Sequence, residues 1–370
     1  MSILFSPMKI KNMVLANRFV RSATNDYFTE GAGYTSDRKV ALYSELAEGE
    51  VGLIISGITS VHPSGQFSNT QASLAGDGYI PGFRRLTDAI HARGGKIAVQ
   101  LWHAGREAGR GRSTINGKAL GPSVVENDPY FKGEYRSMTE EEIWEIIGAF
   151  GDAARRAREA GFDAVQVHGA HAFLLSQFLS PFTNRRDDQW GGELENRLRI
   201  HLEIYKAIRE KVGQDWPVFI KLGVKDGFAG GLQFHEGLKA ARSMAEGGYD
   251  ALEISQGMRG KSYEETEFRT GIDSIQDEAY FRDWCREVKK KVSVPVILVG
   301  GLRTFELMEE IVKNEEADFI SLCRPLIREP GLIREWKNGR RYRAACISCN
   351  KCLESLREKK LLQCVFNQRF

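Results

Sequence analysis

The feature that most constrains the fold of this chain is an eightfold alternation of short apolar runs with longer amphipathic segments. The short runs are rich in Val and Ile, as buried strands are, and a parallel strand needs a crossover helix to reach the next strand. The eight runs are residues 19–24, 52–57, 96–101, 164–169, 217–222, 251–256, 295–300 and 319–324. Eight strand and helix units predict an α/β fold, the (β/α)8 TIM barrel, which 370 residues can accommodate.

Five of the segments between these runs have the length and periodicity of helices. They are residues 139–160, 193–211, 236–247, 277–290 and 304–314. Thr139 is followed three residues later by Glu142, which is the spacing of a capping box at a helix N-terminus. No Gly-x-Gly-x-x-Gly turn follows an early strand, and this argues against an open sheet with a dinucleotide-binding domain.

The ends of the chain are expected to add two small features to the barrel. Near the N-terminus, residues 3–5 and 14–15 flank a turn-like Lys11-Asn12 pair, which predicts a hairpin that closes the bottom of the barrel. Near the C-terminus the composition changes, so we expect residues 1–340 to form the barrel and residues 341–370 a short Cys-rich extension. Residues 104–128, after the third run, are expected to be a surface or lid excursion rather than a domain.

Composition and charge narrow the classes of partner. A net charge of +3 gives no global reason to expect nucleic acid or an anionic membrane surface. No apolar run approaches the roughly 18 to 20 residues that span a bilayer, and the N-terminal residues lack the apolar core of a secretory signal. We therefore expect no membrane or nucleic-acid partner and a cytoplasmic location.

Four of the six cysteines lie within nineteen positions of each other near the C-terminus. They are Cys346, Cys349, Cys352 and Cys364. In a chain without an export signal this clustering favours a metal site over disulfides. The same segment is basic through Arg340, Arg341, Arg343, Lys351, Arg357, Lys359, Lys360 and Arg369. These charges indicate either a solvated face or a docking surface for an acidic electron-transfer protein. Cys285 and Cys323 are expected to be buried small hydrophobes.

Polar residues follow the predicted strands, where an α/β barrel carries its active site. His168 and His171 end the fourth run, and the residues themselves leave three roles open: metal ligands, packing, or donors to a substrate oxygen. Gly300, Gly301 and Arg324 end the last two runs and suit a phosphate site, although the glycines would also suit a tight turn.

Four stretches of the sequence together resemble the motifs of one known family, in that family's order. They are residues 17–20 (NRFV), 100–106 (QLWHAGR), 167–171 (VHGAH) and 180–197 (SPFTNRRDDQWGGELENR). On these motifs the chain resembles the Old Yellow Enzyme family of NADH:flavin oxidoreductases from its N-terminus to about residue 340. The four-cysteine tail is similar to the cluster-binding region of 2,4-dienoyl-CoA reductase and trimethylamine dehydrogenase.

The resemblance implies FMN across the barrel mouth and a [4Fe–4S] cluster on the four tail cysteines, with zinc or free thiols as alternatives. Lys221 stands where most relatives place an arginine near the flavin, so the charge is kept but the bidentate fork is lost. The implied FMN contacts are Ser22, Ala23, Thr24, Gly57, Ile58, Gln100, His168, Lys221, Gly300, Gly301, Cys323 and Arg324.

The implied reaction is that of an ene-reductase, in which reduced FMN N5 gives hydride to an activated, carbonyl-conjugated C=C bond. His168 and His171 would bind the carbonyl oxygen, where negative charge develops. The family's usual proton donor is a tyrosine two residues beyond the second of these, and here that position is Phe173. Tyr27 or water is therefore expected to supply the proton.

The sequence leaves two alternatives for the source of the electrons. The sequence ends six residues after Cys364, so the FAD- and NAD(P)H-binding domains of the two named relatives are not expected. Electrons would come from NAD(P)H docking directly or from a separate electron-transfer protein through the cluster. Relatives range from monomers to higher assemblies, so homo-oligomers are among the expected forms.

Three other functions fit parts of the sequence. The weakest is a nucleic-acid binder that uses the Cys-x-x-Cys spacing and the basic residues, because no aromatic residues are interleaved with these charges. An FMN-dependent amine dehydrogenase would need no proton donor at position 173. A zinc-tailed barrel acting as a binding module would need no flavin.

Overall fold

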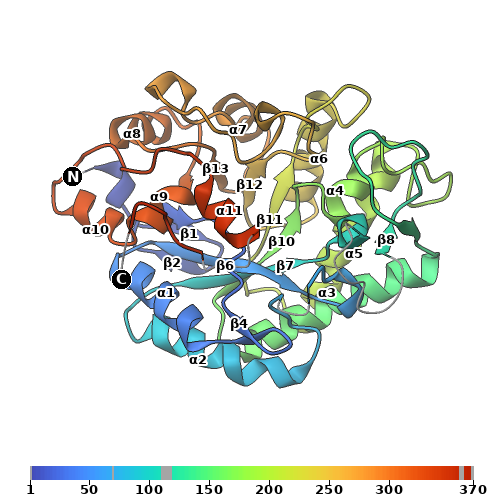
Figure 1. Ribbon diagram of the computed structural model, residues 1–370, viewed down its shortest axis with the longest axis horizontal. Coiled ribbons are helices and arrows are strands. Elements are labelled where there is room, and N and C mark those ends of the chain that lie inside the picture. Colours follow the sequence, from blue (N-terminus) through green and yellow to red (C-terminus); the bar gives the residue numbers. More distant parts are fainter. Residues whose placement is uncertain (1, 69–70, 110–118, 358–361, 368–370) are drawn as a thin grey trace.

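A computed structural model of the chain describes residues 2–68, 71–109, 119–357 and 362–367. Eight parallel strands close into a barrel in the order β10-β11-β12-β13-β14-β3-β6-β7, and each predicted run contributes one strand (Figure 1). The strands are β3 (Phe19–Arg21), β6 (Leu53–Ser60), β7 (Ile97–Trp102), β10 (Ala164–Gly169), β11 (Val218–Gly223), β12 (Leu252–Ser255), β13 (Val296–Val299) and β14 (Phe319–Leu322). The predicted (β/α)8 barrel is confirmed.

The helices surround the barrel, with α11 (Lys351–Arg357) lying over the C-terminal ends of the strands (Figure 1). The others are α1 (Asp37–Glu48), α2 (Ile80–His91), α3 (Glu140–Glu159), α4 (Leu174–Leu179), α5 (Leu194–Val212), α6 (Phe234–Glu246), α7 (Arg282–Lys289), α8 (Phe305–Lys313), α9 (Arg324–Arg328) and α10 (Leu332–Lys337). The predicted capping box is present at the start of α3, where Thr139 and Glu142 exchange hydrogen bonds. Besides the N-terminal hairpin, two small sheets in the described residues lie outside the barrel: β4 (Thr29–Glu30) with β5 (Tyr34–Thr35), and β8 (Ala119–Gly121) with β9 (Tyr135–Ser137).

The inward-facing side chains change from apolar to polar along the strands. At the N-terminal end the interior is filled by an apolar layer that includes Val20, Ala98, Ala164, Phe219, Ala251 and Phe319. Successive inward positions on a strand are two residues apart. Two residues further along the same strands stand Ser22, Gln100, Gln166, Lys221, Glu253 and Ser321, all buried. The strand period therefore lays a polar layer directly on an apolar floor.

The predicted N-terminal hairpin closes this floor. Strands β1 (Met8–Ile10) and β2 (Met13–Leu15) pair antiparallel, and Lys11 in the turn has a positive φ of 53°. Ile10, Met13 and Leu15 join the apolar layer inside the barrel. Residues 3–5, expected to flank the turn as an extended segment, instead form a short 3-10 helix that Ser2 caps.

One predicted helix begins later than expected. Residues 277–290 were assigned to a helix, but α7 begins at Arg282, and a 3-10 turn ends at Asp277. The carboxylate of Glu278 accepts hydrogen bonds from the backbone N–H groups of Arg303 and Thr304, which fixes this segment outside the helix. Tertiary contacts therefore override the helical pattern here.

No helix in the described residues is long and apolar enough to cross a membrane.

The role of the hairpin can be tested with Leu15→Ala. Leu15 is fully buried in the floor, so we expect the substitution to lower the free energy of unfolding by about 2–5 kcal/mol through lost burial and the cavity left behind. The neighbouring Val14 is 50% exposed, so Val14→Ala should change stability by less than about 0.5 kcal/mol. Urea unfolding followed by tryptophan fluorescence measures both, and equal effects would contradict a packed floor.

Candidate functional site

A cavity of about 620 Å³ opens at the C-terminal ends of the strands, where (β/α)8 barrels carry their active sites. Most residues singled out in the sequence border it. They are Ser22, Ala23, Thr24, Tyr27, Ile58, Gln100, His168, His171, Lys221, Gly300, Gly301, Cys323 and Arg324. Gly57 does not border the cavity; its backbone N–H donates to the Tyr43 hydroxyl at 2.8 Å.

A buried ion pair between strands β11 and β12 lies beneath the cavity. Lys221 Nζ lies 3.1 Å from Glu253 Oε1 and donates to Ser22 Oγ at 2.8 Å. Burial raises the pKa of Glu253, but the charge of Lys221 and several hydrogen bonds outweigh it, so the pKa lies below its ordinary value. Glu253 therefore stays ionised, and the stability it contributes is lost only as the pH falls through that lowered pKa.

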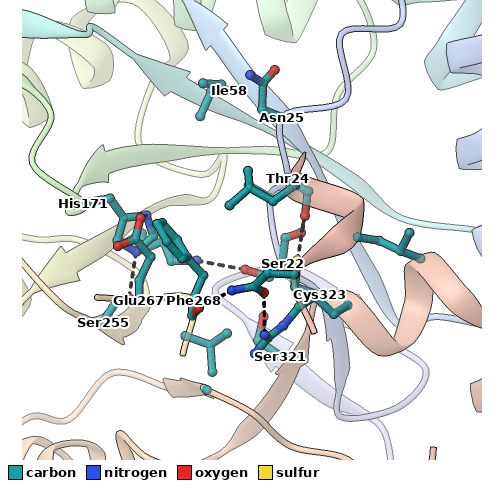
Figure 2. A pocket seen from close by; sticks show the side chains of 18 of the residues that line it. Ser22, Thr24, Asn25, Ile58, His171, Ser255, Glu267, Phe268, Ser321 and Cys323 are labelled. Atoms are coloured by element: carbon teal, nitrogen blue, oxygen red, sulfur yellow. Dashed lines mark hydrogen bonds and ion pairs between the residues drawn. The ribbon is translucent and has the colours of Figure 1, made fainter. Parts of the chain in front are cut away.

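Hydrogen bonds extend from this pair across the polar layer. Gln166 Nε2 donates to Glu253 Oε2 at 2.7 Å, and Gln100 Nε2 donates to Gln166 Oε1 at 2.7 Å. Ser321 Oγ donates to Glu253 Oε1 at 2.9 Å, and Figure 2 shows Ser321 close to Ser22. Gln166 and Glu253 were not predicted as site residues from the sequence, although each interrupts an apolar run at an inward-facing position.

The two glycines after β13 need their backbone conformation. Gly300 has φ 132° and Gly301 φ 72°, and a Cβ at either position would lie 2.9 Å from the ring of Tyr280. The turn therefore requires glycine at both positions. Arg324, at the start of α9, borders the same cavity, so backbone N–H groups and a guanidinium lie in one region suited to a phosphate.

Cys323 differs from the expectation of a buried small hydrophobe. It is half-buried, borders the cavity, and its Sγ lies 3.1 Å from Thr24 Oγ1 (Figure 2). Cys285, inside α7, is fully buried in the hydrophobic core, as expected.

His168 and His171 form an edge-to-face pair with ring centroids 4.9 Å apart. His168 Nδ1 accepts from the backbone N–H of Ala170 at 3.3 Å, and His171 Nε2 lies 2.8 Å from Ser255 Oγ. Burial, with a contribution from the charge of Lys221, lowers the pKa of both imidazoles well below 6.5. Both rings are therefore neutral near pH 7.

The backbone at this pair is held in an unusual conformation. His171 and Ala172 have φ values of 62° and 63°, in the left-handed region that non-glycine residues rarely occupy. Their N–H groups donate to the carbonyls of Gln256 and Gly257, each at 3.0 Å. Such strain persists only where surrounding contacts fix it, and it concentrates at functional sites.

Phe173 borders the cavity at the position where the family would place its tyrosine. Its ring meets Trp102 edge-to-face at 5.2 Å and His168 at 5.1 Å. The side chain lies directly against the imidazole pair, and it carries no group that can donate a proton.

The loop after β12 brings three side chains that the sequence analysis did not identify. Arg259 donates to both carboxylate oxygens of Glu267 at 2.5–3.0 Å, and its guanidinium lies over the rings of Phe173 and Phe268. Glu267 Oε1 is also 3.8 Å from Nδ1 of His171 (Figure 2). Burial lowers the pKa of Arg259, but Glu267 more than offsets this, and the pKa lies above its ordinary value.

The four tail cysteines border one small cavity of about 20 Å³ beside the large one. Cys346 is buried, and Cys349, Cys352 and Cys364 are half-buried free thiols. The backbone N–H of Ser348 points to Cys346 Sγ at 3.5 Å. Within the described residues, no three His, Cys, Asp or Glu side chains are already arranged to hold a metal ion.

The basic residues of the tail are only partly described. Arg340, Arg341 and Arg343 are exposed, and Arg343 Nε donates to Glu278 Oε1 at 2.9 Å. Lys359, Lys360 and Arg369 lie outside the described residues, as does the side chain of Arg357.

Known proteins resemble this chain over most of its length. The model of the NADH:flavin oxidoreductase / NADH oxidase family matches residues 3–343. An NADH oxidase of Thermoanaerobacter brockii is 38% identical over 350 residues, covering 94% of this chain and 52% of its own length. A metal reductase of Desulforamulus reducens is 35% identical over 372 residues, covering 99% of this chain and 54% of its own length. The chain thus spans about half the length of these relatives.

Solved structures show the same barrel. A 2-naphthoyl-CoA reductase in complex with 2-naphthoyl-CoA has a TM-score of 0.88 and 29% identity, over 99% of this chain and 57% of its own. An Old Yellow Enzyme homologue from Zymomonas mobilis has a TM-score of 0.77 and 23% identity, over 93% of this chain and 95% of its own, which shows a shared fold. With the family model matching almost the whole barrel, the chain belongs to the NADH:flavin oxidoreductase / NADH oxidase family of FMN-dependent oxidoreductases.

Proposed function

We propose that this chain binds FMN in the large cavity and reduces activated, carbonyl-conjugated C=C bonds. The observation that carries the proposal is the pair of neutral, buried imidazoles of His168 and His171 beside a cavity that Lys221 underlies. A volume of about 620 Å³ lies in the range of cofactor sites. When bound, FMN would supply the hydride for the substrate and accept electrons from the donor.

The residues that would hold FMN surround this cavity on several sides. Gln100 and Lys221 would meet the polar edge of the ring, and Lys221 would balance negative charge on it. Gly300, Gly301 and Arg324 would bind the phosphate through backbone N–H groups and a guanidinium. Ser22, Ala23, Thr24, Ile58 and Cys323 would complete the wall.

The imidazole pair is suited to stabilise negative charge on a substrate oxygen. Because Nδ1 of His168 accepts a hydrogen bond, its Nε2 carries the proton and can donate. If Ser255 Oγ donates to Nε2 of His171, the proton of that neutral imidazole is on Nδ1, and Glu267 Oε1 at 3.8 Å is beyond hydrogen-bond distance, so Nδ1–H can donate to the substrate oxygen. A well-placed donor contributes about 2.7–4 kcal/mol to such a transition state.

The substrate carbon that becomes a carbanion must then take up a proton. Phe173 cannot give one, and Tyr27, which borders the same cavity, is the proposed donor, with water as the alternative.

The second candidate function is an amine dehydrogenase, which would need no such proton donor. The likeness to a histamine dehydrogenase from Rhizobium sp. 4-9, with a TM-score of 0.85 and 26% identity, supports this second candidate.

Electrons are proposed to reach FMN either from NAD(P)H at the mouth or from a separate electron-transfer protein through a [4Fe–4S] cluster. All four tail cysteines border one small cavity, and four thiolates fit such a cluster or a zinc ion. We propose residues 341–370 as the unit that carries this site, attached to the barrel of residues 1–340.

The imidazole pair is tested by His168→Ala/His171→Ala. We expect loss of the charge-transfer band that phenols give with the bound flavin, and a fall in enone reduction of about 100-fold or more, with FMN still bound. The exposed His235 provides the matched control, because His235→Ala should change neither measurement. Phenol binding retained by the double variant would rule out the proposed role.

The proton donor is tested by Tyr27→Phe. Loss of a general acid should slow enone reduction by about 100-fold or more while leaving FMN affinity unchanged. Tyr34 is 47% exposed, so Tyr34→Phe is the control for removing a hydroxyl. Full activity of Tyr27→Phe towards every accepted enone would leave water as the donor.

The lowered pKa of both imidazoles predicts the pH dependence. Because the charged form appears only well below 6.5, kcat/KM for enones should stay flat as the pH falls from about 8 to about 6.5. Steady-state rates with saturating electron donor measure this. A drop centred at pH 6.5 would show that one imidazole is charged in that range, against the proposal.

Steady-state assays with amines in place of enones distinguish the amine dehydrogenase from the ene-reductase.

A further inference from the structure

The tail forms part of the wall of the large cavity. Ser348, Asn350 and Cys352 border that cavity, and Asn350 and Cys352 also border the small cavity of the four cysteines. We call residues 346–352 the cysteine loop. The two cavities therefore share lining side chains, which come from the cysteine loop and from Arg324 and Ile327 of α9.

Arg324 joins the cysteine loop to the proposed phosphate region. Its Nη1 donates to Asn350 Oδ1 at 2.7 Å and to the Ser348 carbonyl at 3.3 Å. Arg324 borders both cavities. The same Nη1 also donates to the Arg269 carbonyl at 2.8 Å, so the cysteine loop and Arg269 together fix the position of this guanidinium.

Asn350 makes a second connection, towards the imidazole pair. Its Nδ2 donates to the Phe268 carbonyl at 2.6 Å, and the side chain is only 3% exposed. Phe268 follows Glu267, which pairs with Arg259 and lies near His171. An amide can accept from Arg324 and donate to Phe268 at the same time, which neither alanine nor a carboxylate can do.

The backbone of the cysteine loop is strained at two positions. Ser348 and Asn350, on either side of Cys349, have positive φ values of 55° and 59°. The Asn350 carbonyl also accepts from the N–H of Leu353 at 2.8 Å and so starts α11. Such a conformation is kept by its contacts, so ligation of the thiols would stabilise the loop that holds Arg324.

We propose that Asn350 is a positioning residue that couples the four-cysteine site to the flavin cavity. A metal ion or cluster on the cysteines raises the affinity of the cavity for FMN, and FMN raises the retention of the metal by the same factor. This inference rests on the proposed function in taking FMN as the ligand of the large cavity and a metal ion or cluster as the ligand of the four cysteines.

The test is a titration of flavin-free protein with FMN, followed by flavin fluorescence. It is done on protein loaded with iron and sulfide under anaerobic conditions and on protein stripped by a chelator. For the wild-type chain we expect stripping to raise the Kd for FMN by about tenfold. For Asn350→Ala we expect weaker FMN binding in the loaded form and a ratio between the two forms close to one.

Asn338→Ala is the matched control, because Asn338 is exposed and the hydrogen bonds described for it use its backbone N–H, which donates to the carbonyls of Arg334 and Trp336. It should keep the wild-type ratio. Asn350→Asp keeps the acceptor for Arg324 and loses the donor to Phe268, so it should show a reduced ratio even if the alanine variant fails to fold.

Three outcomes would overturn the coupling: equal FMN affinity of loaded and stripped wild-type protein, an unchanged ratio in both Asn350 variants, or no uptake of iron or zinc by the wild-type chain. Absence of FMN binding in every form would instead overturn the proposed function. The two failures are therefore distinguishable.

Discussion

The ion pair of Lys221 with Glu253 is the interaction on which the mouth of this barrel depends. Strand register places Lys221 beside His168 on one side and beside Glu253 on the other. Removing the carboxylate would leave a buried ammonium without a counter-charge, at a cost of about 3–5 kcal/mol. Ser22 and Gln166 bond to the same carboxylate, so one buried charge orders side chains from several strands.

Much of this architecture could be predicted from the sequence because strands and helices repeat with fixed periods. The eight strands, the floor hairpin and the capping box at Thr139 follow from such local patterns. His168, Lys221 and Arg324 were predicted at the cavity because strand ends meet on one side of a barrel. Here position along the strand is enough to place a residue.

Residues of the irregular loops could not be predicted in this way. Arg259, Glu267 and Phe268 follow β12 without any period, and an ion pair, ring contacts and the hydrogen bond from Asn350 hold them at the cavity. Asn350 is equally hidden, since its partners Arg324 and Phe268 are distant in sequence. Tertiary contacts, rather than local propensity, place these side chains.

The apolar floor closed by the hairpin determines how ligands enter and leave the cavity. With the bottom of the barrel packed by Ile10, Met13 and Leu15, molecules exchange with the cavity only from the end where the strands finish. In the proposed reaction a substrate and a nicotinamide would then compete for one entrance and would bind one after the other. Electrons that came by the other proposed route, through the four-cysteine site, would need no entrance and could arrive while the substrate is still bound.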